Sequence, residues 1–330
     1  SARHGLFYRA DLFEKYNISI PSDIDSFYEA AKLLKEYEPN IIPFTWKDAK
    51  VVDFLTVSQG GYNGWGLKDG KIVPAYDTPE YKNTLAVLRK MFAEGLMNQD
   101  FAILQGAERQ AAITSGRAGM YSSVYDDYEF LQPALTAVDP TAKLGLVPVF
   151  NGVTNAQVGS ALYIIPKTVS EEKRDAIFRY FDSSLDQNIL TWEYFGEEGR
   201  NYSLVDGIPV FVDDAAKTEA QTTLLIYKSC AVNPVVIHWP SDSDITKTWK
   251  AATEQYAESA IRNFASPLLS ETQTQKGAEL DKILEDAMVQ YIMGEIDEAG
   301  YDAAIALWYA QGGTKIIEEY TAAYQKSLDQ

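Results

Sequence analysis

The sequence predicts an α/β fold with two lobes. Short apolar runs typical of buried strands alternate with longer segments in which apolar residues recur every three or four positions, and this alternation is characteristic of α/β proteins. The chain is 46% hydrophobic, and its 330 residues are more than one hydrophobic core usually organises. We therefore expect two lobes. From residue 271 onward the pattern is helical, and we expect these helices to lie on the outside.

The first elements are a short strand, a capped helix and a second strand. Residues 6–8 form a short apolar run that predicts a buried strand. Ser22 precedes Asp25 by three positions, as in a capping box, and apolar residues then recur at helical spacing until Pro39. Residues 41–44 predict another strand, and residues 51–57 predict a helix that stops at the glycine pair 60–61.

The middle of the chain continues the alternation. Asp69-Gly70 lies between two short strand patterns and predicts a hairpin turn. Thr78 is expected to cap a long amphipathic helix that has proline at its first position and ends at Gly95. Further along, we expect a helix over 105–115, strands over 119–121, 144–149 and 159–165, and a helix that begins after Ser170.

The last third is first irregular and aromatic and then helical. Around residue 190 the pattern becomes irregular, and Asp206-Gly207 predicts a second turn. Helices are expected over 246–263 and through 271–330, where Leu280, Ile283 and Leu284 begin a helical stripe. We expect Trp308, in this region, to be a core residue.

Charge and motif content exclude several functions. Lys plus Arg number 29 and Asp plus Glu number 47, so the net charge of −18 disfavours nucleic acid as a partner. The sequence contains no run of 18 apolar residues, so it predicts no transmembrane segment. A single cysteine, Cys230, and two histidines, His4 and His238, form no disulfide or zinc pattern, and no common nucleotide or hydrolase motif occurs. We expect no metal, no cofactor and no catalytic residues.

Several segments, in this order, resemble the extracellular solute-binding proteins that deliver sugars to ABC importers, the superfamily of maltose-binding protein. The opening HGLFYRADLFEKYNISIPSDIDSFYEAAKLL is similar to a strand, loop and capped helix of that family. SQGGYNGWGLKDGKI resembles its Gly-Gly turn and hairpin, and DTPEYKNTLAVLRKMFAEGLMN its long helix. AAITSGRAGMYSSVYDDY resembles a helix, glycine and strand that ends in the binding cleft. YFGEEGRNYSLVDGIPVF and the helical end resemble a Gram-positive lipoprotein subgroup.

The resemblance implies a periplasmic-binding-protein-like type II fold with a helical C-terminal region. Residues 9–157 and 264–330 would form the C-terminal-type lobe with the helical tail. Residues 1–8 and 158–263 would supply a hinge strand and the remaining part of the N-terminal-type lobe. Family members carry a longer segment before the opening strand, so we expect the first lobe to be incomplete and the chain to self-associate or to pair with that segment.

The resemblance also implies function. Two lobes would close on a solute, an oligosaccharide, for an ABC importer permease at the extracellular face of a cell membrane, with a lipid anchor on the full-length protein. Sugar sites combine aromatic rings with carboxylates and amides. The expected ligand-binding residues are Tyr125 and Asp126 first, then Trp46, Tyr62, Trp65, Tyr121, Trp192, Tyr194 and Trp239. A carbohydrate-active hydrolase or lyase, and a non-transport surface interaction protein, stay open as alternatives.

Overall fold

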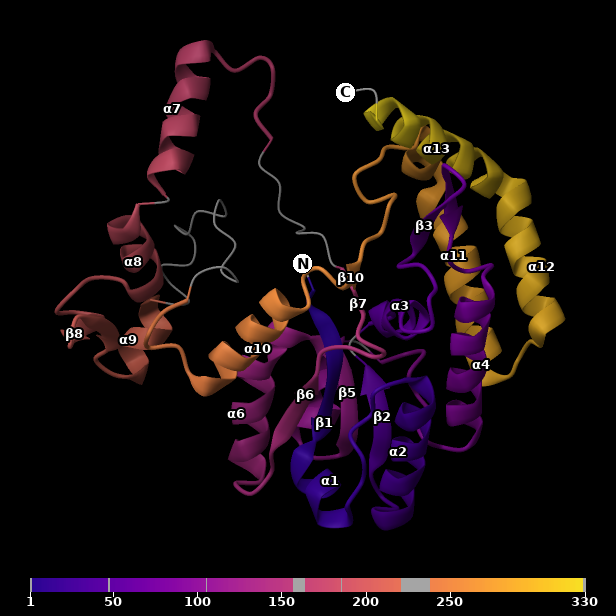
Figure 1. Cartoon of the computed structure of the whole chain (residues 1–330), viewed down its shortest axis with the longest axis horizontal. Coiled ribbons are helices and arrows are strands. Elements are labelled where there is room, and N and C mark those ends of the chain that lie inside the picture. The colour runs from indigo at the N-terminus through magenta and orange to yellow at the C-terminus, as the bar shows by residue number, and fades with distance from the viewer. Residues whose placement is uncertain are drawn as a thin grey trace. The chain divides into compact units, whose positions relative to one another are not determined.

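The chain forms two compact units in a computed structural model that describes residues 2–46, 48–104, 106–156, 164–184, 186–220 and 238–328 (Figure 1). The larger unit comprises Ser1–Val158 and Ala251–Gln330, and the smaller unit comprises Gly159–Lys250. The sequence placed residues 1–8 and 251–263 with the smaller lobe, whereas these contact-based units place them in the larger one. The assignment of the units to two ligand-binding lobes stays a prediction.

The larger unit is built on a four-stranded sheet with helices on both faces. Its strand order is β2-β5-β1-β6, and β1 runs antiparallel to β5 and β6 while β2 runs parallel to β5. The strands are β1 (His4–Arg9), β2 (Ile42–Trp46), β5 (Ala118–Val124) and β6 (Leu144–Val147). The strands predicted over 6–8, 41–44, 119–121 and 144–149 are therefore confirmed, each with shifted ends.

Successive residues of these strands serve two different cores, as expected for a sheet covered on both faces. Leu6 and Met120 face the main core, whereas Phe7 and Tyr121 face a second cluster. Helices α2 (Ile24–Tyr37) and α3 (Lys50–Val57) belong to the main core. Helices α5 (Gly106–Thr114) and α6 (Tyr128–Val138) cover the second cluster, and α1 (Ala10–Tyr16) follows β1 directly.

The cap of α2 differs from the sequence prediction by one residue. Asp23, not Ser22, is the N-cap residue, and its side chain accepts a hydrogen bond from the backbone N–H of Ser26. The Ser26 hydroxyl in turn accepts from the backbone N–H of Asp23, which completes the capping box. Both pairs have the same spacing, so the sequence alone could not choose between them.

The predicted hairpin at Asp69-Gly70 is confirmed. Strands β3 (Trp65–Lys68) and β4 (Lys71–Pro74) are antiparallel, and the two turn residues have φ angles of 49° and 74°, as a type I′ turn requires. The hairpin is bound to the last helix, because the backbone N–H of Ile72 donates to Thr321 Oγ1 at 3.0 Å. The helical tail is thus attached to the middle of the chain.

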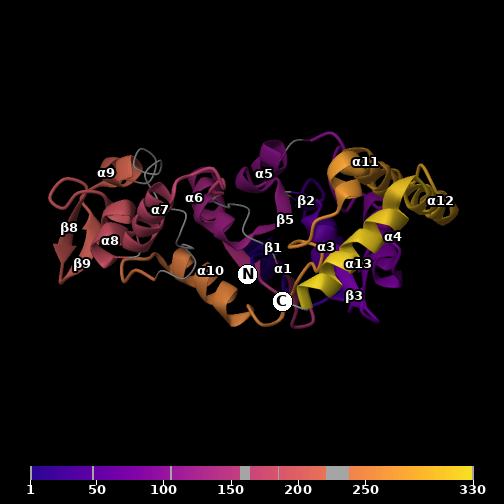
Figure 2. The same ribbon diagram turned by 90° about the horizontal axis from the view of Figure 1, so that it is seen from above.

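Four helices lie side by side at one edge of the larger unit in both views (Figures 1 and 2). They are α4 (Pro79–Ala93), α11 (Glu271–Met293), α12 (Glu298–Trp308) and α13 (Thr314–Leu328), and a short π-helical turn, Tyr309–Gly313, joins the last two. Thr78 caps α4 with Pro79 at its first position, as predicted. Trp308 is 1% exposed, which confirms its assignment to the core.

Two short strands lie where the chain passes between the units. Strand β7 (Thr154–Asn155) pairs in parallel with β10 (Ala260–Ile261). The helix predicted over 246–263 therefore ends early: α10 covers Asp244–Gln255, and the residues after it extend to pair with β7. The strand predicted over 159–165 lies largely outside the described residues, as does Cys230.

In its described residues, the smaller unit contains helices and a β-hairpin. Its elements are α7 (Glu171–Ser183), α8 (Gln187–Phe195), β8 (Tyr202–Val205), β9 (Ile208–Phe211), α9 (Asp214–Thr218) and the first part of α10. Ser170 caps α7, as predicted. The predicted turn is confirmed as well, with φ angles of 52° at Asp206 and 79° at Gly207.

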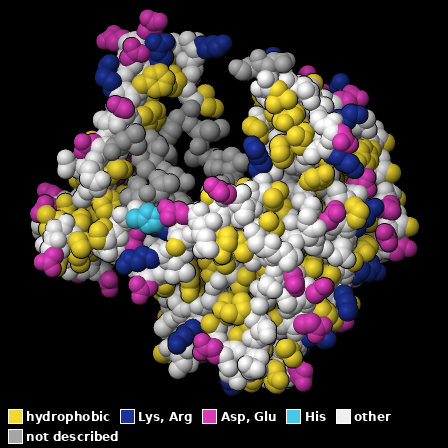
Figure 3. All heavy atoms as spheres, viewed as in Figure 1, with side chains coloured by type: hydrophobic (Ala, Val, Ile, Leu, Met, Phe, Trp, Pro, Cys, Tyr) yellow, Lys and Arg dark blue, Asp and Glu magenta, His cyan; other side chains and the backbone are white. Residues whose placement is uncertain are grey.

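Charged side chains are dispersed over the face of the molecule drawn in Figure 3. On the face drawn in Figure 3, acidic and basic side chains lie among each other with hydrophobic ones between them, so the excess of acidic residues forms no single field there. None of the helices described is long and apolar enough to cross a membrane.

Candidate functional site

The segment expected to reach the ligand leaves the sheet at the end of β5. The strand ends at Val124, residues Tyr125–Asp127 form one turn of 3-10 helix, and α6 begins at Tyr128. The backbone N–H of Tyr125 donates to the Arg3 carbonyl oxygen at 2.7 Å, so this turn lies against the residues that precede β1. The strand therefore runs three residues beyond the end that the sequence predicted, which was Tyr121.

Tyr125 is packed in the fold. Its side chain is 0% exposed, and its hydroxyl donates to the carbonyl oxygen of Pro148 at 2.6 Å. A Cβ atom at Gly5 would come within 2.8 Å of the ring, so glycine is needed for this close approach. Burial raises the pKa of the tyrosine above its usual value. The hydroxyl already has a protein partner, and its contact with a ligand stays a prediction.

Asp126 is held by an arginine that sequence reasoning missed. Arg3 donates to its carboxylate through Nε at 2.9 Å and through Nη2 at 2.6 Å. The bond to Asp126 raises the pKa of the guanidinium, against the opposite effect of burial. The two side chains are 41% and 33% exposed, so solvent or a ligand can reach the pair. Any group that contacts Asp126 would therefore meet a guanidinium too.

We predict that Tyr125→Phe lowers the free energy of unfolding by about 0.5–1.5 kcal/mol, because the Pro148 carbonyl loses its buried donor. Urea denaturation followed by circular dichroism measures this change. Tyr37→Phe is the matched control, since Tyr37 is 44% exposed and stacks on Tyr16. Equal stability of Y125F and the wild type would contradict the assigned role of the hydroxyl.

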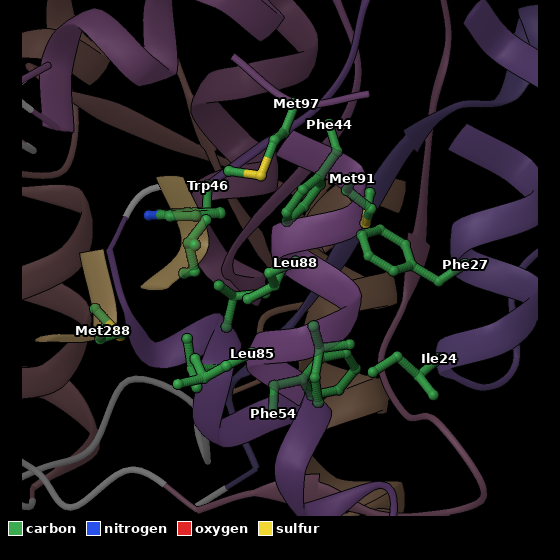
Figure 4. Close-up of a cluster of buried hydrophobic side chains, with 14 of the residues drawn as sticks. Ile24, Phe27, Phe44, Trp46, Phe54, Leu85, Leu88, Met91, Met97 and Met288 are labelled. Carbon is green, nitrogen blue, oxygen red and sulfur yellow. The ribbon is translucent and has the colours of Figure 1, made fainter. Parts of the chain in front are cut away.

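Trp46 and Tyr121 also lie in the cores. Trp46 is 3% exposed and stands edge-on to Phe101, with ring centroids 5.2 Å apart, and Figure 4 shows it among the main-core side chains. Tyr121 is 0% exposed and belongs to the second cluster. Burial raises its pKa. Neither side chain is accessible in this structure, and their contact with a ligand stays a prediction.

Tyr62 and Trp65 lie beside the hairpin. The Tyr62 ring occupies the space next to Gly66, where a Cβ atom would come within 2.2 Å of it. Trp65 is half-buried and contacts Trp308 and Tyr320 of the C-terminal helices, at centroid distances of 6.2 Å and 5.1 Å. Its described ring contacts thus join the hairpin to the helical tail.

The remaining predicted aromatic residues lie in the smaller unit. Trp239 stands edge-on to Phe195, with ring centroids 4.9 Å apart, and Tyr194 lies 5.6 Å from the Trp239 ring. Phe195 also contacts Tyr202 from β8. Trp192 lies in the same helix as Tyr194 but is 43% exposed. The structure therefore brings two of the three predicted residues together, in an aromatic cluster with Phe195 and Tyr202.

A cavity of about 670 Å³ opens beside this aromatic cluster. Its described lining residues are Gln187, Asn188, Leu190, Thr191, Glu198, Tyr202, Leu204, Gly207, Pro209, His238, Trp239 and Pro240. They come from α8, from the loop after it, from the β8–β9 hairpin and from the segment before α10. Sequence reasoning missed most of them, because only the fold brings residues 187–209 together with residues 238–240.

A buried ion pair fixes the segment that carries Trp239, one of the lining residues of the cavity. Asp242 accepts from Lys250 Nζ at 2.6 Å and from the backbone N–H of Trp239 at 3.1 Å. The two charged side chains are 11% and 5% exposed, so this carboxylate is committed to positioning the Trp239 segment. The described part of the chain contains no group of three His, Cys, Asp or Glu side chains arranged to hold a metal ion.

Comparison with known proteins assigns the fold and the family. Residues 2–182 match the family model described as bacterial extracellular solute-binding protein. The chain belongs to this family. Lipoprotein LipO of Bacillus subtilis is 28% identical, over 97% of the chain and 68% of that protein. The polygalacturonan/rhamnogalacturonan-binding protein YtcQ of the same organism is 25% identical, over 99% of the chain and 68% of its own length.

A solved structure supports the fold assignment. An HMO-binding ABC-transporter-associated solute-binding protein from Bifidobacterium longum infantis superposes with a TM-score of 0.74 at 16% identity, covering 97% of the chain and 73% of that protein. The predicted family and the type II periplasmic-binding-protein-like fold are confirmed. Members of this family bind extracellular solutes, and the absence of enzymatic activity in this chain stays a prediction.

Proposed function

We propose that the chain binds an extracellular oligosaccharide for delivery to an ABC importer, and that the cavity beside the aromatic cluster of the smaller unit contributes to the sugar site. The observation that carries this proposal is the composition of the cavity wall. The rings of Tyr202 and Trp239 and the amides of Gln187 and Asn188 line the same cavity. Aromatic rings pack on the apolar faces of pyranoses while amides bond to hydroxyls, so this lining suits a sugar.

An unpaired donor in the cavity wall supports the same role. Trp239 is 8% exposed, and its Nε1 has no hydrogen-bond partner among the described residues. A buried donor without a partner is costly, whereas a ligand hydroxyl or a bound water would satisfy it. Trp239 therefore offers a ring and a donor to the same ligand.

The charge of the lining favours a neutral ligand. Glu198 contributes a carboxylate, and the described lining contains no lysine or arginine. A uronate would meet this carboxylate without a guanidinium to compensate for it. Arg3 in the larger unit is already bonded to Asp126. YtcQ is named for polygalacturonan and rhamnogalacturonan, whereas the charge of this lining leads us to propose a neutral oligosaccharide for this chain.

A titration tests the proposal. We expect neutral oligosaccharides to change the tryptophan fluorescence saturably and oligogalacturonides to leave it unchanged, with no reducing sugar released in either case. Release of reducing sugar would support the hydrolase or lyase alternative. The absence of any thermal shift across a glycan panel would support the surface interaction alternative.

The partners and the location are part of the same proposal. A solute-binding protein of this family serves an importer, so we propose a permease as the second partner and the outer face of the membrane as the location. The name of the relative, Lipoprotein LipO, supports a lipid anchor as the means of attachment. Self-association stays a prediction, and sedimentation as a monomer at high concentration would contradict it.

A further inference from the structure

The chain leaves the larger unit once and returns to it once, and two short paired strands of the larger unit flank this excursion along the sequence. Strand β7 precedes the first passage, and β10 follows the return. The two strands are parallel, with Thr154 opposite Ala260 and Asn155 opposite Ile261. Each strand has two residues, so the ladder between them is short and few backbone hydrogen bonds hold the two passages together.

A buried asparagine joins these two strands. Asn63 Nδ2 donates to the carbonyl oxygen of Ala156 at 2.8 Å and to that of Ile261 at 2.8 Å. The Ile261 oxygen also accepts the backbone N–H of Ala156 at 2.8 Å. Asn63 is 3% exposed, so solvent cannot replace these bonds. One side chain therefore holds both passages by using both amide hydrogens.

The loop that carries Asn63 is itself fixed on the returning segment. The backbone N–H of Phe264 donates to the Trp65 carbonyl oxygen at 3.0 Å. Gly64 has a φ angle of 70°, and a Cβ atom there would come within 2.8 Å of Asn263 Nδ2. The positive φ angle favours glycine at this turn, and the Asn263 side chain lies against it. This contact gives Asn63 a rigid base.

On its other side, β7 is anchored to the central sheet. The Thr154 hydroxyl donates to the His4 carbonyl oxygen at 2.8 Å, and Ala2 forms a bridge with Ala156. His4 lies in β1, in the middle of the sheet. Asn63 extends this anchoring from β7 to β10, so both passages start from one fixed base.

We propose that Asn63 is a positioning residue that clamps the two passages and so restricts the motion of the smaller unit against the larger one. The proposal rests on the proposed function insofar as that motion accompanies ligand binding. With the clamp intact, Ala156 and Ile261 stay fixed to each other through Asn63. A ligand then shifts the population between open and closed forms along a defined path.

The test uses Asn63→Asp, which has nearly the same shape and lacks the two donors. Spin labels at Ala102→Cys and Ser203→Cys, in a Cys230→Ser background, report the distance between the units without any ligand. We expect a broader distance distribution in the variant and about tenfold faster hydrogen exchange at the Ala156 amide. Asn83→Asp is the matched control, because Asn83 is exposed and its amide donates to Gln59 Oε1. The N83D variant should show the distance distribution and the Ala156 exchange rate of the wild type.

Acidification separates a clamp from a general loss of structure. Protonation of the new carboxyl restores one donor, so the distribution of N63D should narrow as the pH falls, while that of the wild type should not. An unchanged distribution in N63D, or a broad one that acid does not narrow, would overturn the proposal. Failure of the sugar titration in the wild type would overturn the proposed function alone, because the label distances require no ligand.

Discussion

Trp308→Ala should lower the free energy of unfolding of the larger unit by about 3–5 kcal/mol, the usual cost of removing a buried aromatic ring. Trp308 is 1% exposed and contacts Trp65, Tyr76 and Tyr309, at centroid distances of 6.2, 5.3 and 5.1 Å. Gly313 leaves room for the indole, since a Cβ atom there would come within 2.2 Å of it. Alanine would leave a cavity where the hairpin meets the C-terminal helices. Urea denaturation followed by circular dichroism measures the loss.

The neighbouring residue provides the control. Leu307 lies in the same helix but is 46% exposed, so Leu307→Ala should change stability by less than about 0.5 kcal/mol. Proteolysis offers a second readout, because the loosened α12–α13 segment should be cut before the sheet in W308A. If W308A and L307A unfold at the same urea concentration, the helical tail does not depend on this aromatic contact.

Local sequence signals predicted the elements whose causes are local. The Thr78 cap with Pro79 and the Ser170 cap are set by residues within one turn, and they lie where predicted. The two Asp-Gly turns depend on residues that tolerate a positive φ, and they were predicted as well. The helix expected over 246–263 was too long, because Ala260 and Ile261 pair with a strand about a hundred residues earlier. No local pattern contains that partner.

For the candidate site residues too, local position follows from the sequence, whereas their partners depend on the fold. The position of Tyr125 at a strand end follows from the sequence, but its burial is decided by Pro148 and Gly5, which only the fold brings near. The partner of Asp126 is Arg3, which precedes β1 and is more than a hundred residues away in the sequence. Trp239 and Tyr194 were chosen as isolated aromatics, and their ring contact results from packing between α8 and a distant segment. Residue type predicted the chemistry, whereas the fold determines which groups meet.

Trp239→Ala should weaken binding of the neutral oligosaccharide by about 2 kcal/mol, roughly thirtyfold in Kd, if the cavity contributes to the sugar site. The substitution removes both the ring in the cavity wall and its Nε1 donor, which has no partner in the described part of the chain. Trp239→Phe keeps a smaller ring against Phe195 and loses the donor, so its Kd should rise by less than that of W239A. Isothermal titration calorimetry on the intact chain measures both. Trp192→Ala is the control for general effects on α8, because Trp192 is 43% exposed and is not among the described lining residues. A folded W239A protein with the affinity of the wild type would place the sugar elsewhere, and an equal loss in W192A would move the contact to the exposed side of α8.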